Sequence, residues 1–311
     1  MEAKLSAVEI PAIGELVDEF LASCGTRNLS PESIKLYRIA LDRFLIYDIC
    51  SVDMIDPRLI RKYIFSLQSS GLSPTSVRQY FIILKIFLGF LVEEGFISGN
   101  PALLVQAPKS AERIPQVLNE NQAQALLDLC PDYSWTGKRD KTAIFLMLGS
   151  GIRLSELLSL NLFDVNMESG EVTVMGKGSR QRITSIDDDV TEALKFWIAL
   201  REKVLAGRPQ NALFINRSYG RLGKAFGQTV KQLAAQAGFD CTPHTLRHTH
   251  ATALLRNGAD IKYVKEQLGH SSLTTTEIYL HLANEDLKEV VSKCSITRRL
   301  RFDSRQMSLM D

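Results

Sequence analysis

The sequence predicts a mainly α-helical protein with a small β-sheet, folded as two domains. The chain has 311 residues, about twice the usual length of a single domain. Apolar residues recur at helical spacing through much of it, and two short runs with strand-like composition flank a glycine-containing turn. Apolar residues make up 45% of the chain and charged residues 23%, which is the balance of a folded globular protein.

Two stretches near the N-terminus share one helix-start pattern. Each places serine before proline, at Ser30-Pro31 and at Ser73-Pro74, and each continues with apolar residues at helical spacing. A serine hydroxyl can accept from the free N–H groups of a first helical turn, and proline at the first helical position has no N–H to lose. Residues 1–105 are therefore expected to contain an all-helical domain.

The segment 106–116 is the predicted interdomain linker, because it contains two prolines, is mostly polar and shows no helical period. A second domain is expected over 117–294, followed by a basic C-terminal tail over 295–311.

The second domain is predicted to be helical around a β-hairpin. Its strands are expected at 171–174 and 182–185, joined by a turn that contains Lys177. Its predicted helices include three segments: 153–160, 243–256 and 261–268, the last ended by Gly269.

Composition limits the possible environments and partners. No apolar run approaches the roughly 20 residues of a membrane span, and the acidic N-terminus lacks the features of a signal peptide, so we expect a cytoplasmic protein without a membrane partner. The five cysteines are scattered without a CxxC pair, which indicates reduced thiols. Because the net charge is only +2, any nucleic-acid contact must come from local basic surfaces.

Two arginine motifs have the chemistry of a phosphate site. Thr242 is a plausible N-cap, so His244 and Arg247 would share one face of the first helical turns. Arg153 follows a glycine-rich stretch, and Glu156, three residues later, could orient its guanidinium. Taken alone, each motif has a simpler interpretation: a surface arginine beside a capping histidine, and a solvated i,i+3 ion pair.

Lys177 and Tyr279 are candidates with equally simple alternatives. Most lysines in turns remain in water, and Tyr279 could be a core aromatic residue of a helix. An ordinary phenol has a pKa near 10, so it becomes a nucleophile only where cations stabilise the phenolate or a base takes its proton. A metal site at His244 and His248 is disfavoured, because no carboxylate or cysteine accompanies them at ligand spacing. We expect no metal and no cofactor.

The order of these motifs carries more information than any one of them. Arginine with a following glutamate precedes a lysine in a strand turn, then His-x-x-Arg, Leu-Gly-His and Ile-Tyr with histidine two residues on. This set resembles the tyrosine recombinase, or phage integrase, family, in particular its Xer-like site-specific recombinases. The resemblance spans essentially the whole chain and implies a two-domain DNA clamp, with a helical core-binding domain and an α+β catalytic domain.

The resemblance also implies residue roles and partners. The phosphate-activating set would be Arg153, Lys177, His244, Arg247 and His270. Tyr279 would be the nucleophile that forms a 3′-phosphotyrosine with DNA, and Glu156 a supporting acid. The partners implied are a double-stranded recombination site and a homotetramer on two such sites.

Several alternatives remain open from the sequence. These are a non-catalytic DNA-binding accessory protein on the same scaffold, a type IB topoisomerase-like enzyme, and a helical scaffold with accidental motifs. Within the recombinases, the sequence does not choose between a Xer-like resolvase and the integrase or transposase of a mobile element. It also leaves open whether a second recombinase takes part.

Overall fold

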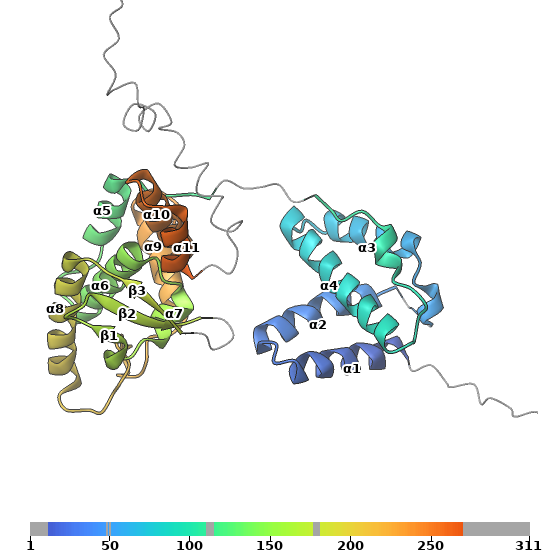
Figure 1. Cartoon of the computed structure of the whole chain (residues 1–311), viewed down its shortest axis with the longest axis horizontal. Helices are drawn as coiled ribbons and strands as arrows, with labels where there is room; N and C mark the ends of the chain where they lie inside the picture. Colours follow the sequence, from blue (N-terminus) through green and yellow to red (C-terminus); the bar gives the residue numbers. More distant parts are fainter. Residues whose placement is uncertain (1–11, 48, 50, 110–114, 177–180, 270–311) are drawn as a thin grey trace, which may run out of the picture. The chain divides into compact units, whose positions relative to one another are not determined.

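A computed structural model describes residues 12–47, 49, 51–109, 115–176 and 181–269 (Figure 1). Contacts divide the chain into two compact units, Met1–Arg113 and Ile114–Asp311. We refer to them as the N-terminal and C-terminal units. The boundary between them falls within the segment 106–116.

The described part of the N-terminal unit is helical. Its elements are α1 (Ile13–Thr26), α2 (Pro31–Leu45), η1 (Val52–Met54), α3 (Pro57–Ser69), α4 (Pro74–Glu93) and η2 (Pro101–Leu104). Both predicted serine caps are confirmed, since the Ser30 hydroxyl accepts from the Ser33 N–H and the Ser73 hydroxyl from the Ser76 N–H, each at 3.2 Å. The caps start α2 and α4, which pack against each other around one apolar core.

Helix α4 corrects the expectation that no segment is long and apolar enough to cross a membrane. It has 20 residues and a mean hydropathy of 1.5 over 18 of them, so it passes on length and composition. Half of that window is buried inside the N-terminal unit, where Phe87, Leu88 and Leu91 are fully covered. A core helix passes the same test, and the apolar residues of α4 fill this core.

Seven helices and a three-stranded sheet make up the described part of the C-terminal unit. The helices are α5 (Glu120–Asp128), α6 (Trp135–Ser150), α7 (Leu154–Ser159), α8 (Asp188–Leu205), α9 (Phe226–Gln236), α10 (Pro243–Arg256) and α11 (Ile261–Leu268), with a short η3 (Leu162–Asp164). The strands are β1 (Val165–Asn166), β2 (Glu171–Met175) and β3 (Gln181–Ser185). Helix α6 packs against both α8 and α10 and supplies much of the buried core.

The predicted hairpin is present, but the sheet has one strand more than the sequence indicated. β2 pairs with β3 in antiparallel register, and β1 pairs with the other edge of β2 through Val165 and Val172. A two-residue strand is too short to give an alternating pattern, which explains why it was missed.

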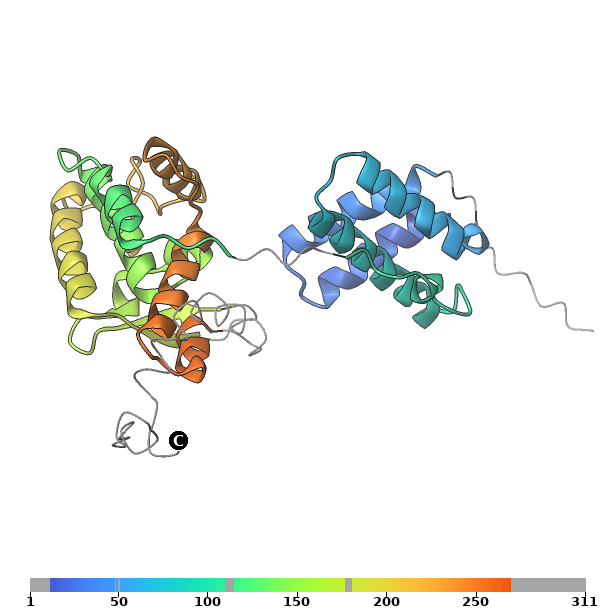
Figure 2. The same cartoon turned by 90° about the horizontal axis from the view of Figure 1, so that it is seen from above.

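Side chains at the C-terminal end of α11 attach that helix to β3. Gln267 pairs with the backbone of Ser185, accepting from its N–H at 3.1 Å and donating to its carbonyl at 2.7 Å. The Thr184 hydroxyl donates to the carbonyl of Ser150 at the end of α6, at 3.2 Å. Helices α10 and α11 pack against each other, and both views show them together (Figures 1 and 2). The ends of α6, α11 and β3 therefore meet in one place.

Candidate active site

Helix α10 holds two of the predicted residues on its first turns. The Thr242 hydroxyl accepts from the Thr245 N–H at 3.2 Å, and the Thr245 hydroxyl accepts in return from the Thr242 N–H at 3.1 Å. This reciprocal cap confirms the predicted helix start. It fixes the turn that carries His244 and Arg247.

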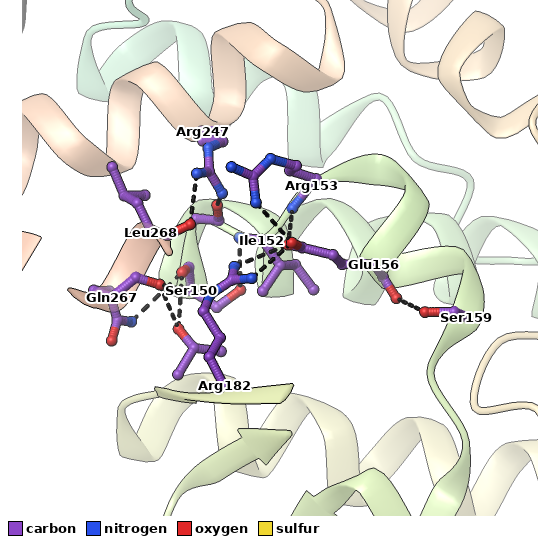
Figure 3. Close-up of polar contacts among 11 residues, drawn as sticks. Ser150, Ile152, Arg153, Glu156, Ser159, Arg182, Arg247, Gln267 and Leu268 are labelled. Carbon is purple, nitrogen blue, oxygen red and sulfur yellow. Dashed lines mark hydrogen bonds and ion pairs between the residues drawn. The ribbon is translucent and has the colours of Figure 1, made fainter. Parts of the chain in front are cut away.

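Arg247 is buried, with 3% of the residue exposed. Its Nη1 donates to the carbonyl of Gly151 at 2.7 Å and its Nη2 to the carbonyl of Leu268 at 2.6 Å (Figure 3). These carbonyls lie at the C-terminal ends of α6 and α11, where carbonyl groups lack helical partners. The interpretation of Arg247 as a surface arginine is therefore wrong, because two helix ends fix its guanidinium.

Glu156 orients Arg153 as the sequence suggested, and it does so inside the protein. Its Oε2 accepts from the Arg153 backbone N–H at 2.7 Å, and its Oε1 accepts from Arg153 Nη1 at 2.8 Å. The side chain of Glu156 is 2% exposed, against 34% for that of Arg153. The pair is thus not a solvated surface ion pair. The buried carboxylate of Glu156 fixes the partly exposed guanidinium of Arg153.

A third arginine, which sequence reasoning missed, completes this cluster. Arg182 of β3 donates from Nη1 to Glu156 Oε1 at 2.6 Å and from Nη2 to Oε2 at 2.9 Å (Figure 3). Its Nε also donates to the carbonyl of Gln267, at 3.4 Å. No local signal pairs Arg182 with Glu156, since 26 residues separate them and only the fold brings them together.

The local electrostatics favour an ionised glutamate and a neutral histidine. Burial by itself would raise the pKa of Glu156, but hydrogen bonds from Arg182 and Arg153 outweigh it and hold the pKa below its ordinary value. The side chain of His244 is exposed, yet partial desolvation and then the charges of Arg247 and Arg153 lower its pKa. At neutral pH His244 is therefore an uncharged imidazole beside fixed cations.

A surface hollow of about 790 Å³ lies at this cluster. Its lining includes Arg153, His244, Arg221 and Lys224, together with residues of α7. Cationic and imidazole groups around one opening suit an anionic ligand such as a DNA phosphate.

Three of the predicted site residues, Lys177, His270 and Tyr279, lie outside the described residues. The structure thus brings together Arg153, Glu156, His244 and Arg247 and adds Arg182 to them.

Three cysteines lie among the residues that the structure describes. Cys24, Cys130 and Cys241 are free buried thiols, and burial raises the pKa of Cys130 and of Cys241 to about 12. Within the part of the chain that the structure describes, no three His, Cys, Asp or Glu side chains gather as a metal site would require.

Comparison with known proteins identifies the family. Residues 116–286 match the model of the phage integrase family, and residues 16–95 match its N-terminal SAM-like domain. Over 275 residues the chain is 34% identical to the tyrosine recombinase XerD of Staphylococcus saprophyticus. The aligned region covers 86% of this chain and 93% of that relative. The chain is a tyrosine recombinase of the phage integrase family. Members of this family cleave and rejoin DNA through a covalent tyrosine intermediate.

Solved structures agree with this family at the level of the fold. The XerH site-specific recombinase bound to its difH substrate aligns with a TM-score of 0.73 at 24% identity, over 89% of this chain and 83% of that one. The Tn1549 transposon integrase in complex with transposon end DNA aligns with a TM-score of 0.75 at 20% identity, over 92% of this chain and all of that one. The family match and the 34% identity to XerD favour the recombinase interpretation over an accessory protein, a topoisomerase-like enzyme and an unrelated scaffold.

Proposed function

We propose that Arg153, Lys177, His244, Arg247 and His270 activate one DNA phosphate for attack by Tyr279, with Glu156 as a positioning residue. The observation that carries this proposal is the fixed placement of two arginines at one site. Arg247 is anchored on the carbonyls of Gly151 and Leu268, and Arg153 is anchored on Glu156. Their motifs stand in the order that resembles the family's catalytic set.

The arginines stabilise charge that develops during attack. When a phenolate adds to a phosphodiester, negative charge grows on the equatorial oxygens of the phosphorus. Cations fixed in advance interact more strongly with this transition state than with the ground state, so they accelerate the reaction. His244, held uncharged next to these cations, donates one hydrogen bond to the phosphate without adding another positive charge.

The remaining steps transfer protons and replace one phosphoester bond by another. The Tyr279 oxygen bonds to phosphorus, the bond to the 5′-oxygen breaks, and Lys177 protonates that oxygen as general acid. His270 accepts the proton that leaves the phenol. The phosphotyrosine keeps roughly the energy of the broken ester, so the 5′-hydroxyl of another strand can reverse the step without ATP or metal.

The substrate is a double-stranded recombination site made of two half-sites. A half reaction yields recombination only when several copies hold two duplexes together, so we propose a homotetramer on two sites. The N-terminal unit acts as the core-binding half of the DNA clamp, the C-terminal unit as the catalytic half, and the protein works in the cytoplasm. The 34% identity to XerD favours a Xer-like resolvase among the recombinase classes.

Replacement of Tyr279 by phenylalanine tests the central assignment. Tyr279→Phe keeps the ring and removes the hydroxyl, so half-site binding is expected to persist while the denaturant-resistant protein–DNA adduct disappears. The assay uses a nicked suicide substrate carrying the chain's own recombination site. Tyr263→Phe is the matched control, because Tyr263 is an exposed tyrosine on α11 outside the motif set. An adduct at full yield in Tyr279→Phe would overturn the assignment.

A further inference from the structure

Arg182 of β3 donates two hydrogen bonds to Glu156, the residue that holds Arg153. We propose that it is a positioning residue for cleavage, which acts through Glu156 to hold Arg153 in place and to keep that arginine's charge effective. The inference rests on the role of Arg153 proposed above. It adds to the site a residue that acts through Glu156.

Hydrogen-bond accounting at Glu156 gives the first argument. A carboxylate offers about four acceptor positions. In this site Oε1 accepts from Arg153 Nη1 and Arg182 Nη1, and Oε2 accepts from the Arg153 N–H and Arg182 Nη2. All four positions are occupied, so the carboxylate is fixed in one orientation. Without Arg182, one bond on each oxygen is lost, and only the two bonds from Arg153 remain to hold Glu156 in this orientation.

Charge accounting gives the second argument. Arg153 and Glu156 alone would form a neutral pair, in which the buried carboxylate cancels most of the field that the guanidinium presents to a phosphate. Arg182 supplies a second positive charge to the same carboxylate. The three side chains together carry a net charge of about +1, in a partly desolvated setting where charge interactions are strong.

Exposure separates the roles of the two arginines. The side chain of Arg153 is 34% exposed and lines the hollow, whereas that of Arg182 is 14% exposed and is absent from its lining. Arg153 can therefore meet DNA directly, whereas both Nη atoms of Arg182 are bonded to Glu156. Figure 3 shows the two guanidinium groups converging on Glu156.

The same side chain also contacts the segment that anchors Arg247. Gly269 has φ +65°, and a Cβ built there would lie 2.5 Å from the Arg182 Cδ and 2.7 Å from its Nε. The Arg182 side chain thus lies against the chain immediately after Leu268, whose carbonyl accepts from Arg247. One side chain therefore connects β3, Glu156 of α7 and the end of α11.

A competing route for any effect of Arg182 runs through Lys177, since Arg182 lies in the strand that follows the Lys177 turn. A loss through Lys177 would slow protonation of the leaving 5′-oxygen, whereas a loss through Arg153 would weaken stabilisation of the equatorial oxygens. A general acid is dispensable when sulfur replaces the bridging 5′-oxygen, because a thiolate leaves without protonation. Stabilisation of charge on the equatorial oxygens remains necessary with either leaving group.

Single-turnover cleavage of oxygen- and sulfur-bridged suicide substrates separates these routes. We expect Arg182→Ala to bind half-site DNA normally and to cleave both substrates about 10²-fold more slowly, the loss typical of a misplaced catalytic group. Arg182→Lys, which keeps a cation but loses the two-pronged donor, should recover part of the rate. Gln181→Ala, an exposed neighbour in β3, is the matched control and should cleave like wild type.

A double-mutant cycle with Glu156→Gln tests the connection to Glu156 independently of Lys177. If Arg182 acts through Glu156, adding Arg182→Ala to Glu156→Gln should slow cleavage little further, because effects within one unit are not additive. Sulfur rescue of Arg182→Ala, a wild-type rate, or fully additive losses would each overturn the proposal. If Arg182→Ala unfolds, as its tryptophan fluorescence would show, Arg182→Lys replaces it in the same cycle.

Cleavage of the sulfur substrate by Lys177→Ala tests the general-acid role of Lys177 separately from the positioning role of Arg182. If sulfur fails to rescue Lys177→Ala while the Glu156 cycle is non-additive, the assignment of Lys177 falls and that of Arg182 stands. If Arg153→Ala cleaves at the wild-type rate, the proposed function of Arg153 itself is refuted.

Discussion

At the scale of single residues, Gly151 links the fold to the site. It ends α6 in the left-handed conformation with φ +65°, and its carbonyl accepts from the buried Arg247. A Cβ at this position would lie 2.5 Å from Cδ2 of His250 and 2.8 Å from Cδ2 of Leu268. Glycine is therefore required twice, by the backbone conformation and by the close packing.

Gly151→Ala is expected to lower the free energy of unfolding of the C-terminal unit by about 2–4 kcal/mol, the sum of left-handed strain and overpacking. Tryptophan fluorescence in urea measures this unit selectively, because both tryptophans, Trp135 and Trp197, belong to it. Gly207→Ala is the control. Its φ is +82°, but a Cβ added there would meet no other atom of the described residues within 4 Å, so only strain of about 1 kcal/mol is expected. Equal losses in the two variants would contradict the packing argument.

His250 makes the stability of the same unit depend on pH. It is 7% exposed, and its Nδ1 lies 2.8 Å from the Leu148 carbonyl, to which it donates. Burial, reinforced by the charge of Arg247, lowers its pKa from 6.5 to about 4. Between these two values the unfolded chain binds the proton and the folded chain does not, so the free energy of unfolding falls as pH drops from 6.5 to 4.

Urea titrations of wild type and His250→Phe between pH 7 and pH 4 test this dependence. The wild type should lose up to about 1.4 kcal/mol per pH unit from this group in that window, and the variant should lose correspondingly less. The difference between the two proteins should therefore shrink as the pH falls. Parallel curves would show that His250 does not titrate as its burial requires.

At the scale of elements, the start of α10 holds two residues of the proposed site. Thr242 and Thr245 cap this helix reciprocally, and His244 and Arg247 lie in the turns that the cap holds. A cap stabilises a helix end by satisfying N–H groups that have no helical partner. Its loss should therefore affect both stability and the geometry of the site.

Thr242→Ala is expected to destabilise the C-terminal unit by about 1 kcal/mol and to slow cleavage, whereas Thr242→Ser should retain both properties because its hydroxyl still accepts. Ser73→Ala removes the equivalent cap of α4 in the N-terminal unit and should leave the tryptophan transition unchanged. Urea unfolding and the suicide-substrate assay provide the two readouts. A Thr242→Ala variant with wild-type cleavage would show that the cap does not position the site.

At the scale of the whole molecule, a net charge of +2 leaves DNA binding to local surfaces. The C-terminal segment is one candidate, although it lies outside the described residues. Its sequence predicts an amphipathic helix over 284–291 with an apolar strip, and then a tail with four arginines: Arg298, Arg299, Arg301 and Arg305. We infer that the helix docks on a neighbouring copy and that the tail contacts phosphates.

Deletion of residues from Glu285 onward should preserve binding to one half-site with a shallower dependence on salt, because fewer phosphates are neutralised. Cooperative occupation of paired half-sites and strand exchange should be lost. A gel-shift titration at several salt concentrations measures both effects. Unchanged cooperativity would rule out docking on a neighbour, and global unfolding would instead indicate that the helix packs on its own unit.

The sequence by itself determined the features that depend on neighbouring residues. Ser30, Ser73 and Thr242 cap helices where their side chains reach N–H groups three residues on, so a short window of sequence contains the whole interaction. The β2–β3 hairpin and the pairing of Arg153 with Glu156 are local in the same sense. The order of the motifs along the chain was sufficient to indicate the family.

Tertiary structure alone decided which of these groups are buried and what holds them. Arg247 and Glu156 are charged residue types that are usually exposed, and their burial depends on how α6, α7, α11 and β3 pack. Arg182 reaches Glu156 across 26 residues, and Arg247 reaches Gly151 across 96. Contacts of this range arise only after the chain has folded, because no periodicity or local propensity encodes which distant side chains will meet.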